Sequence, residues 1–180
     1  KKLNRNYFSF FSKEGAILIN NILMVVVCAT VFLGTIYPLI IEALTGNKIS
    51  VGEPYFNSTV IPIILPAILI MGVGPILSWG ENNKLKILKK FILPILITII
   101  LTLLIFLYYR SFSFFGILGI LLSIWIISNN LVLILRNIKK NINGMIIAHL
   151  GFGILILGIT GSSIWQKEKI VKMNIGNEMK

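Results

Sequence analysis

The feature that most constrains the fold of this 180-residue chain is a series of five apolar runs, separated by short polar or basic segments. A transmembrane helix needs roughly 20 apolar residues to cross the hydrocarbon core of a bilayer, which is about 30 Å thick. Hydrophobic residues make up 56% of the chain and charged residues only 13%, which excludes an ordinary soluble domain. The sequence therefore predicts an all-α integral membrane protein, with about five transmembrane helices from a larger multi-spanning bundle. The expected spans are residues 15–41, 58–79, 91–109, 114–135 and 144–165.

Lysine and arginine are concentrated in alternate segments between these runs. Because positive residues mark the cytoplasmic side of a membrane protein, we expect segment 1–14 in the cytoplasm and segment 166–180 to begin an external part. The formal charge of +11 is then explained by membrane topology. We therefore expect the chain to contact membrane lipid and not to bind nucleic acid. The residues on the expected cytoplasmic side are Lys1, Lys2, Arg5, Lys13, Lys84, Lys86, Lys89, Lys90, Arg136, Lys139 and Lys140.

Residues 42–57 are expected to form an ordered external loop, because they contain the turn sequences Gly-Asn and Gly-Glu-Pro. We expect Tyr55 and Phe56 of this loop to lie against the membrane surface. The first run contains Pro38 and is expected to bend or fray at its outer end, and the proline-rich second run is expected to be kinked.

Few residues of the chain can carry chemistry. There is no aspartate, there is one histidine and one cysteine, and every glutamate lies outside the predicted spans. This composition excludes serine or cysteine triads, zinc sites and carboxylate dyads within the segment. Cys28 can form no internal disulfide and is expected to be a small packing residue.

His149 is the exception, because it lies inside the fifth span within the sequence GMIIAHLG at 144–151. Its depth is roughly 9 Å from the cytoplasmic boundary at a rise of about 1.5 Å per residue. An ionisable residue within a membrane is costly and suggests function. Two interpretations stay open at this stage: His149 is an axial ligand of a cofactor metal, or it is a neutral histidine bonded to a neighbouring helix.

The residues around His149 favour a ligand. Gly153 lies one turn away on the same side of the helix and would leave a notch along which a planar macrocycle could lie. A second stripe of small residues is expected to pack closely against another helix. Its members are Gly144, Ala148, Gly151, Gly158 and Ser162.

Four asparagines lie at a depth similar to that of His149 and form a predicted polar layer. They either join helices through hydrogen bonds or orient His149 and meet the propionates of a cofactor. Met24 or Met71 could supply a second axial ligand, although both are expected to be packing residues and the second ligand to lie elsewhere in the protein. The asparagines are Asn20, Asn21, Asn129 and Asn130.

Several motifs together resemble the CcmF/NrfE family, the haem-lyase subunits of cytochrome c maturation. The similar segments are FFSKEG at 10–15 followed by two asparagines, GTIYPL at 34–39, KISVGEPYFN at 48–57, and the segment that contains His149. They occur in the family's order and cover residues 8–79 and 143–163. Residues 91–135 are recognisable only as membrane helix.

The resemblance implies a protein that takes haem from a membrane-tethered chaperone and joins its vinyl groups to the CxxCH thiols of an apocytochrome c. It implies a bacterial inner-membrane location, with the mitochondrial inner membrane as the alternative, and other maturation subunits as partners. It also implies a b-type haem in the membrane between two histidines. His149 matches the more C-terminal of these two histidines, so it would be an axial ligand of the haem iron.

The chain departs from the family pattern in several places. The tryptophan-rich external motif, the two external histidines beside it and the partner histidine of the membrane haem are not in this sequence. The chain would be part of the family's C-terminal half, and this segment alone is expected neither to ligate the substrate haem nor to catalyse its attachment. The alternatives are a secondary transporter segment, in which the broken second span and the asparagines form a substrate path, and a respiratory cytochrome b subunit.

Overall fold

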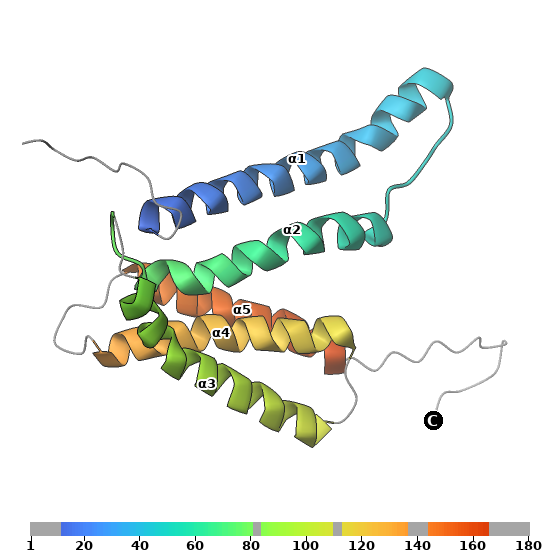
Figure 1. Cartoon of the computed structure of the whole chain (residues 1–180). Helices are drawn as coiled ribbons and strands as arrows, with labels where there is room; N and C mark the ends of the chain where they lie inside the picture. Colours follow the sequence, from blue (N-terminus) through green and yellow to red (C-terminus); the bar gives the residue numbers. More distant parts are fainter. Residues whose placement is uncertain (1–11, 81–83, 110–112, 137–143, 166–180) are drawn as a thin grey trace, which may run out of the picture.

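The computed structural model describes residues 12–80, 84–109, 113–136 and 144–165, and these residues form five long helices and one short 3₁₀ turn. Successive helices run in opposite directions along a common axis (Figure 1). The starts of α1, α3 and α5 therefore lie at the same end of the bundle as the ends of α2 and α4. The elements are α1 (Lys13–Thr45), α2 (Glu53–Val73), η1 (Gly74–Ile76), α3 (Lys84–Tyr109), α4 (Phe114–Arg136) and α5 (Gly144–Trp165).

Five helices of the described chain are long and apolar enough to cross a membrane, which confirms the predicted all-α membrane fold. Large apolar side chains cover much of the outer surface of the bundle. On α1, for example, Val25 is 68% exposed and Leu33 is 63% exposed. Such surfaces suit a lipid environment, in which a helix satisfies its own backbone hydrogen bonds. Cys28, expected to be a packing residue, is exposed on this same helix.

Helix α4 forms the centre of the described bundle, because it packs against α2, α3 and α5, whereas α1 contacts α2 and η1. The core cluster contains Ile68 of α2 with Leu122 and Ile126 of α4, and Ile126 is completely buried. Small residues let these helices approach closely, as is common in membrane proteins. Gly119 of α4, for example, lies against the side chain of Thr160 of α5.

The helices extend beyond several predicted span boundaries, so the segment between α1 and α2 is shorter than the expected loop 42–57. Helix α1 continues to Thr45, where Gly46 ends it with a φ of 70° and donates its N–H to the carbonyl of Glu42. Helix α2 begins at Glu53, because a proline in the first turn favours a helix start.

Tyr55 and Phe56 consequently lie in the first turn of α2 and not in a loop on the membrane surface. Both aromatic rings pack against Gly34 of α1, which has no side chain to exclude them. The hydroxyl of Tyr55 also lies 3.4 Å from the carbonyl oxygen of Thr30, to which it donates. Two segments of the sequence resemblance thus meet in space and join α1 to α2.

The prolines inside α1 and α2 do not break these helices. Helix α1 is unbroken at Pro38, and α2 is unbroken at Pro62 and Pro66. The interruption in the second span comes later, at η1, where Pro75 follows Gly74 and the chain then becomes extended at Leu77. Because η1 is buried against the bundle, this break helps to shape the cavity described next.

Candidate functional site

The ring of His149 is fixed by a hydrogen bond within its own helix. Its Nδ1 lies 2.7 Å from the carbonyl oxygen of Met145, one turn earlier on α5. A carbonyl oxygen can only accept, so Nδ1 is the donor, and in this tautomer Nε2 keeps its lone pair. Metal-binding histidines are commonly oriented in this way, with one ring nitrogen donating to a carbonyl and the other facing the metal.

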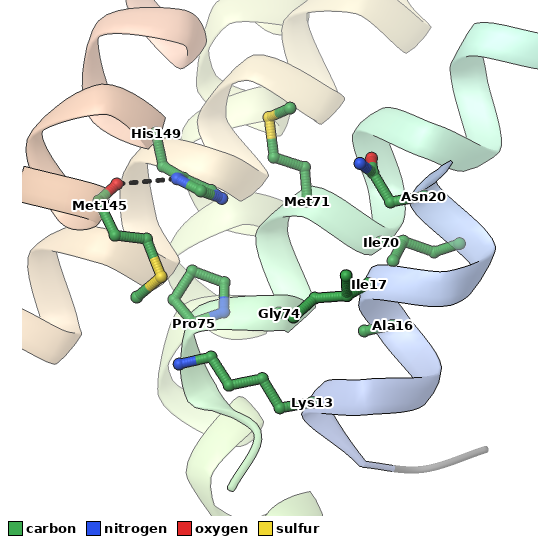
Figure 2. A pocket seen from close by; sticks show the side chains of 10 residues that line it. All are labelled: Lys13, Ala16, Ile17, Asn20, Ile70, Met71, Gly74, Pro75, Met145 and His149. Atoms are coloured by element: carbon green, nitrogen blue, oxygen red, sulfur yellow. Dashed lines mark hydrogen bonds between the residues drawn. The ribbon is translucent and has the colours of Figure 1, made fainter. Parts of the chain in front are cut away.

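His149 lines a cavity of about 230 Å³ between the start of α1, the end of α2 with η1, and the start of α5. Figure 2 shows the ring pointing away from α5, with Met71 and Asn20 on the facing helices. The described residues that line it are Lys13, Ala16, Ile17, Asn20, Ile70, Met71, Gly74, Pro75, Met145 and His149. The cavity is therefore an apolar space that contains one imidazole, one amide and one ammonium group.

Local sequence explains why the cavity exists at this place. Ala16 and Gly74 present little or no side chain to it, so the two helices leave space where larger residues would fill it. The 3₁₀ turn at the end of α2 then carries Pro75 beneath His149 (Figure 2). The sequence predicts only a kink in the proline-rich second run, which includes Pro75.

The first turn of α1 is held against the extended segment that follows η1. Ser12 caps the helix, since its hydroxyl accepts a hydrogen bond from the N–H of Gly15 at 3.2 Å. The N–H of Lys13 donates to the carbonyl of Ser78 at 3.1 Å. The carboxylate of Glu14 accepts the N–H of Gly80 through both oxygens, at 2.9 and 3.1 Å.

Lys13 is a lining residue for which the sequence predicts no role at this site. Its ammonium nitrogen lies 5.5 Å from the centre of the Trp79 ring, a cation–π distance. Its position in the sequence indicates only the cytoplasmic side of the membrane. A usable signal was its position in the FFSKEG segment, directly before the first apolar run.

The structure brings only part of the predicted site together. Asn20 and Met71 line the cavity with His149, whereas Asn21 is exposed and Met24 is 41% exposed outside it. The predicted small-residue stripe of α5 is exposed in the described bundle, and a Cβ added at Gly144, Gly151 or Gly158 would meet nothing within 4 Å.

Gly153 does not line the cavity. It is buried against α4, where an added Cβ would lie 2.8 Å from Ile127 Cγ1 and 3.3 Å from Ile126 Cγ2. The notch expected for a macrocycle is therefore occupied by the side chains of these two isoleucines. The helical period placed Gly153 on the same side as His149, but the packing of α4 covers that part of the helix.

Asn129 and Asn130 are buried in α4, and their amide hydrogen bonds are made within that helix and not to His149. Their amide nitrogens donate to carbonyls one turn earlier in α4, those of Trp125 at 2.7 Å and Ile126 at 2.9 Å. Their Oδ1 atoms have no hydrogen-bond partner among the described residues. The predicted polar layer thus consists of separate contacts and does not form one continuous network.

Among the described residues there is no group of three or more His, Cys, Asp or Glu side chains that could hold a metal ion. A single histidine with a free Nε2 can still supply one axial ligand to a metal that a cofactor holds by other bonds. This is the chemistry that the cavity offers.

Known relatives match the chain over nearly its whole length. It is 33% identical over 178 residues to the cytochrome c-type biogenesis protein CcmF of Escherichia coli (strain K12), which is 95% of the chain and 28% of that protein. It is 30% identical over 186 residues to CycK of Rhizobium meliloti (strain 1021), covering 94% of the chain and 28% of that protein. It is 33% identical over 171 residues to NrfE of Haemophilus influenzae, covering 92% of the chain and 27% of that protein.

The chain spans about 28% of the length of the curated relatives that it matches. No family model matches the chain, and no solved structure matches it. Several relatives, all cytochrome c-type biogenesis proteins, nevertheless match the chain at similar identity and over nearly its whole length. These matches confirm the resemblance found in the motifs. The chain belongs to the CcmF/CycK/NrfE family of cytochrome c-type biogenesis proteins.

Proposed function

We propose that this chain is part of a membrane haem lyase subunit for the biogenesis of c-type cytochromes. The protein would take haem from a membrane haem chaperone and attach it to the CxxCH segment of apocytochrome c. The support is that the relatives are cytochrome c-type biogenesis proteins and match 92–95% of the chain. Because the chain spans about 28% of their length, the remainder of the protein and other maturation subunits would supply the substrate site.

Within this protein, His149 is an axial ligand of a b-type haem in the membrane. The observation that carries this assignment is the hydrogen bond from Nδ1 of His149 to the carbonyl of Met145, at 2.7 Å. That bond sets the tautomer and leaves Nε2 free to bind iron, on a ring that lines a cavity between three helices.

The imidazole of His149 is a suitable ligand for haem iron. The cavity, however, is large enough for only part of the porphyrin ring. Its volume of about 230 Å³ lies below the range of roughly 300–1,000 Å³ that is usual for sites of small molecules. A macrocycle would therefore extend past the described lining, and the second iron ligand would come from elsewhere in the protein. When bound, a b-type haem supplies electron transfer, which would keep the iron of the substrate haem reduced.

The proposed location is the bacterial inner membrane, with the mitochondrial inner membrane as the alternative. The starts of α1 and α3 and the end of α4 would face the cytoplasm. This orientation is supported by the basic residues at that end of the bundle, which include Lys13, Lys89 and Arg136. At the opposite end, Lys48 is neutralised in part by Glu42, whose carboxylate lies 3.8 Å away.

The test is the reduced-minus-oxidised optical spectrum of the protein purified from membranes, with His149→Ala compared with the wild type. We expect a b-type band in the wild type and its loss in the variant. The matched control is Asn21→Ala, which removes an exposed polar side chain on α1 and should keep the band.

A further variant separates ligation from folding. His149→Gly leaves space for free imidazole, which should restore the band if the lost group was an iron ligand. An unchanged band in a folded His149→Ala protein would assign His149 to helix packing. A folded wild type with no haem band would favour the transporter alternative.

A further inference from the structure

The mouth of the His149 cavity contains an ammonium group with no counter-ion among the described residues. Lys13 is the charged residue among the described lining residues, and its side chain extends from α1 toward Pro75 and Met145 (Figure 2). The ion pair found in the described parts of the chain joins Lys48 to Glu42, near the opposite end of the bundle. Within a largely apolar cavity, a lysine ammonium is expected to meet an acceptor that carries negative charge.

The nearest carboxylate in the sequence is already engaged. Both oxygens of Glu14 accept the N–H of Gly80, at 2.9 and 3.1 Å, so this carboxylate holds the segment after η1. The N–H of Lys13 is also bound to that segment, through the carbonyl of Ser78. These contacts fix the first turn of α1 beside the cavity and keep Lys13 at its mouth without neutralising it.

The polar groups of the cavity occupy two levels along α1. Lys13 is the first residue of the helix, and Asn20 follows about 10 Å deeper at a rise of about 1.5 Å per residue. His149 lies opposite, on α5, with Nε2 free. This arrangement suits an amphipathic ligand whose interior part is bound by the nitrogen of His149 and whose anionic oxygen group lies at the end of the cavity that contains Lys13.

We propose that Lys13 binds a propionate carboxylate of the haem whose iron His149 binds. This inference rests on the proposed function, because it names a second contact of the same ligand. Lys13 would orient the ring so that its propionates face the end of the bundle where α1 begins. The cation–π contact with Trp79, at 5.5 Å between the ammonium nitrogen and the ring centre, holds the ammonium in place.

The experiment compares binding of haem with binding of haem dimethyl ester, in which both carboxylates are neutral. Titrations use the purified protein in nanodiscs of zwitterionic lipid and follow the optical band that depends on His149. The measured quantity is the ratio of the two affinities in each variant, so that partitioning of the more apolar ester into lipid cancels between variants. The wild type should favour haem, and Lys13→Met should lower this ratio about tenfold, the equivalent of about 1.4 kcal/mol for one charge-assisted contact.

Two further lysine variants and one matched control sharpen the result. Lys13→Arg keeps the charge and should keep most of the preference, whereas Lys13→Gln is polar but uncharged and should behave like Lys13→Met. Lys48→Met removes the same charge at the other end of the bundle and should leave the ratio unchanged. Circular dichroism of each variant checks that the helices are intact.

The outcomes distinguish this inference from the proposed function. If haem binding needs His149 but the ratio of haem to ester affinity is the same in Lys13→Met as in the wild type, the role of Lys13 is overturned. The haem site at His149 is then still supported. Absence of binding that depends on His149 would overturn both. Repeating the titration in nanodiscs with phosphatidylglycerol tests a lipid source for the anion. If Lys13→Met changes only the retention of that lipid, the ammonium binds a phosphate and not a propionate.

Discussion

The indole ring of Trp125 on α4 lies directly against the backbone of Gly72 on α2, so that a methyl group at Gly72 would collide with the ring. The indole N–H donates to the carbonyl of Leu69 on α2 at 3.1 Å. The ring of Phe91 on α3 stacks on Trp125 with centroids 5.9 Å apart and planes at 23°. Three helices are therefore joined at one side chain, next to the core cluster that contains Ile68 and Ile126.

Gly72→Ala should destabilise the bundle, because the added methyl group must displace the indole and stretch its hydrogen bond to Leu69. We expect a loss of about 1–3 kcal/mol in the free energy of unfolding, as is usual for an overpacked interior. The measurement is unfolding by SDS in mixed micelles, followed by tryptophan fluorescence.

Gly151→Ala is the control for that substitution. Gly151 is an exposed glycine of α5 at which a Cβ would meet nothing within 4 Å, so this change should leave stability equal or slightly higher. Equal destabilisation by both substitutions would mean that helix propensity, and not contact with Trp125, decides the effect.

A buried hydroxyl pair joins α3 to α4. The hydroxyl oxygens of Thr98 and Ser128 are 2.9 Å apart, and the same carbonyl of Pro94 accepts from Thr98 at 2.8 Å and from Ser128 at 3.3 Å. Both side chains are almost fully buried. We expect Thr98→Val and Ser128→Ala to couple by about 0.6 kcal/mol and at most about 1.7 kcal/mol, the range found for hydrogen bonds between membrane helices.

A double-mutant cycle in mixed micelles measures this coupling. Thr35→Val serves as the control partner for Ser128→Ala, since Thr35 is exposed and bonds to a carbonyl of its own helix at 2.9 Å. Distant sites should be additive. A coupling no larger than in the control cycle would show that Thr98 and Ser128 contribute independently.

The fold class could be predicted from the sequence because the length of each apolar run alone determines whether it can span a membrane. The ends of the helices were harder to predict, since Gly-Glu-Pro at 52–54 reads equally as a turn or as the first turn of a helix. The structure uses it as a helix start, and this brings Tyr55 and Phe56 against Gly34.

The candidate site was predictable only in part, for a physical reason. His149 can be identified from the sequence alone, because an ionisable residue in a membrane is costly. The residues that surround it in the folded protein depend on which helices pack together, and the sequence does not show this. Helical period placed Gly153 beside His149, yet the close approach of α4 fills that position with Ile126 and Ile127. Lys13 and Met71 line the cavity from two helices, and their positions are far apart in the sequence. No local sequence pattern predicts that these two residues lie near His149.

Gly80 gives a test of the segment that holds the first turn of α1. Its φ of 76° is in the left-handed region, which costs other residues about 1–2 kcal/mol. Gly80→Ala should strain the N–H that Glu14 binds, and so release Lys13 from the cavity mouth. We expect the preference for haem over its dimethyl ester to fall as it does in Lys13→Met.

The matched control for Gly80→Ala is Gly46→Ala. Gly46 has a φ of 70° and its added Cβ would also meet nothing within 4 Å, but it lies at the opposite end of α1. A similar loss of stability with an unchanged ligand preference is expected there. If both variants change the preference equally, general strain in α1 is responsible and the segment after η1 has no specific role.

Of the two methionines considered as a second ligand, Met71 lines the cavity with His149, whereas Met24 lies outside it. We nevertheless expect Met71 to be a packing residue, with the second axial ligand elsewhere in the protein. Met71→Leu keeps the volume of the side chain and should leave both the optical band and the reduction potential unchanged. A thioether ligand raises the potential of a haem, so its loss would lower the midpoint in a redox titration. A lower midpoint in Met71→Leu, with no change in Met24→Leu, would instead identify Met71 as the second ligand.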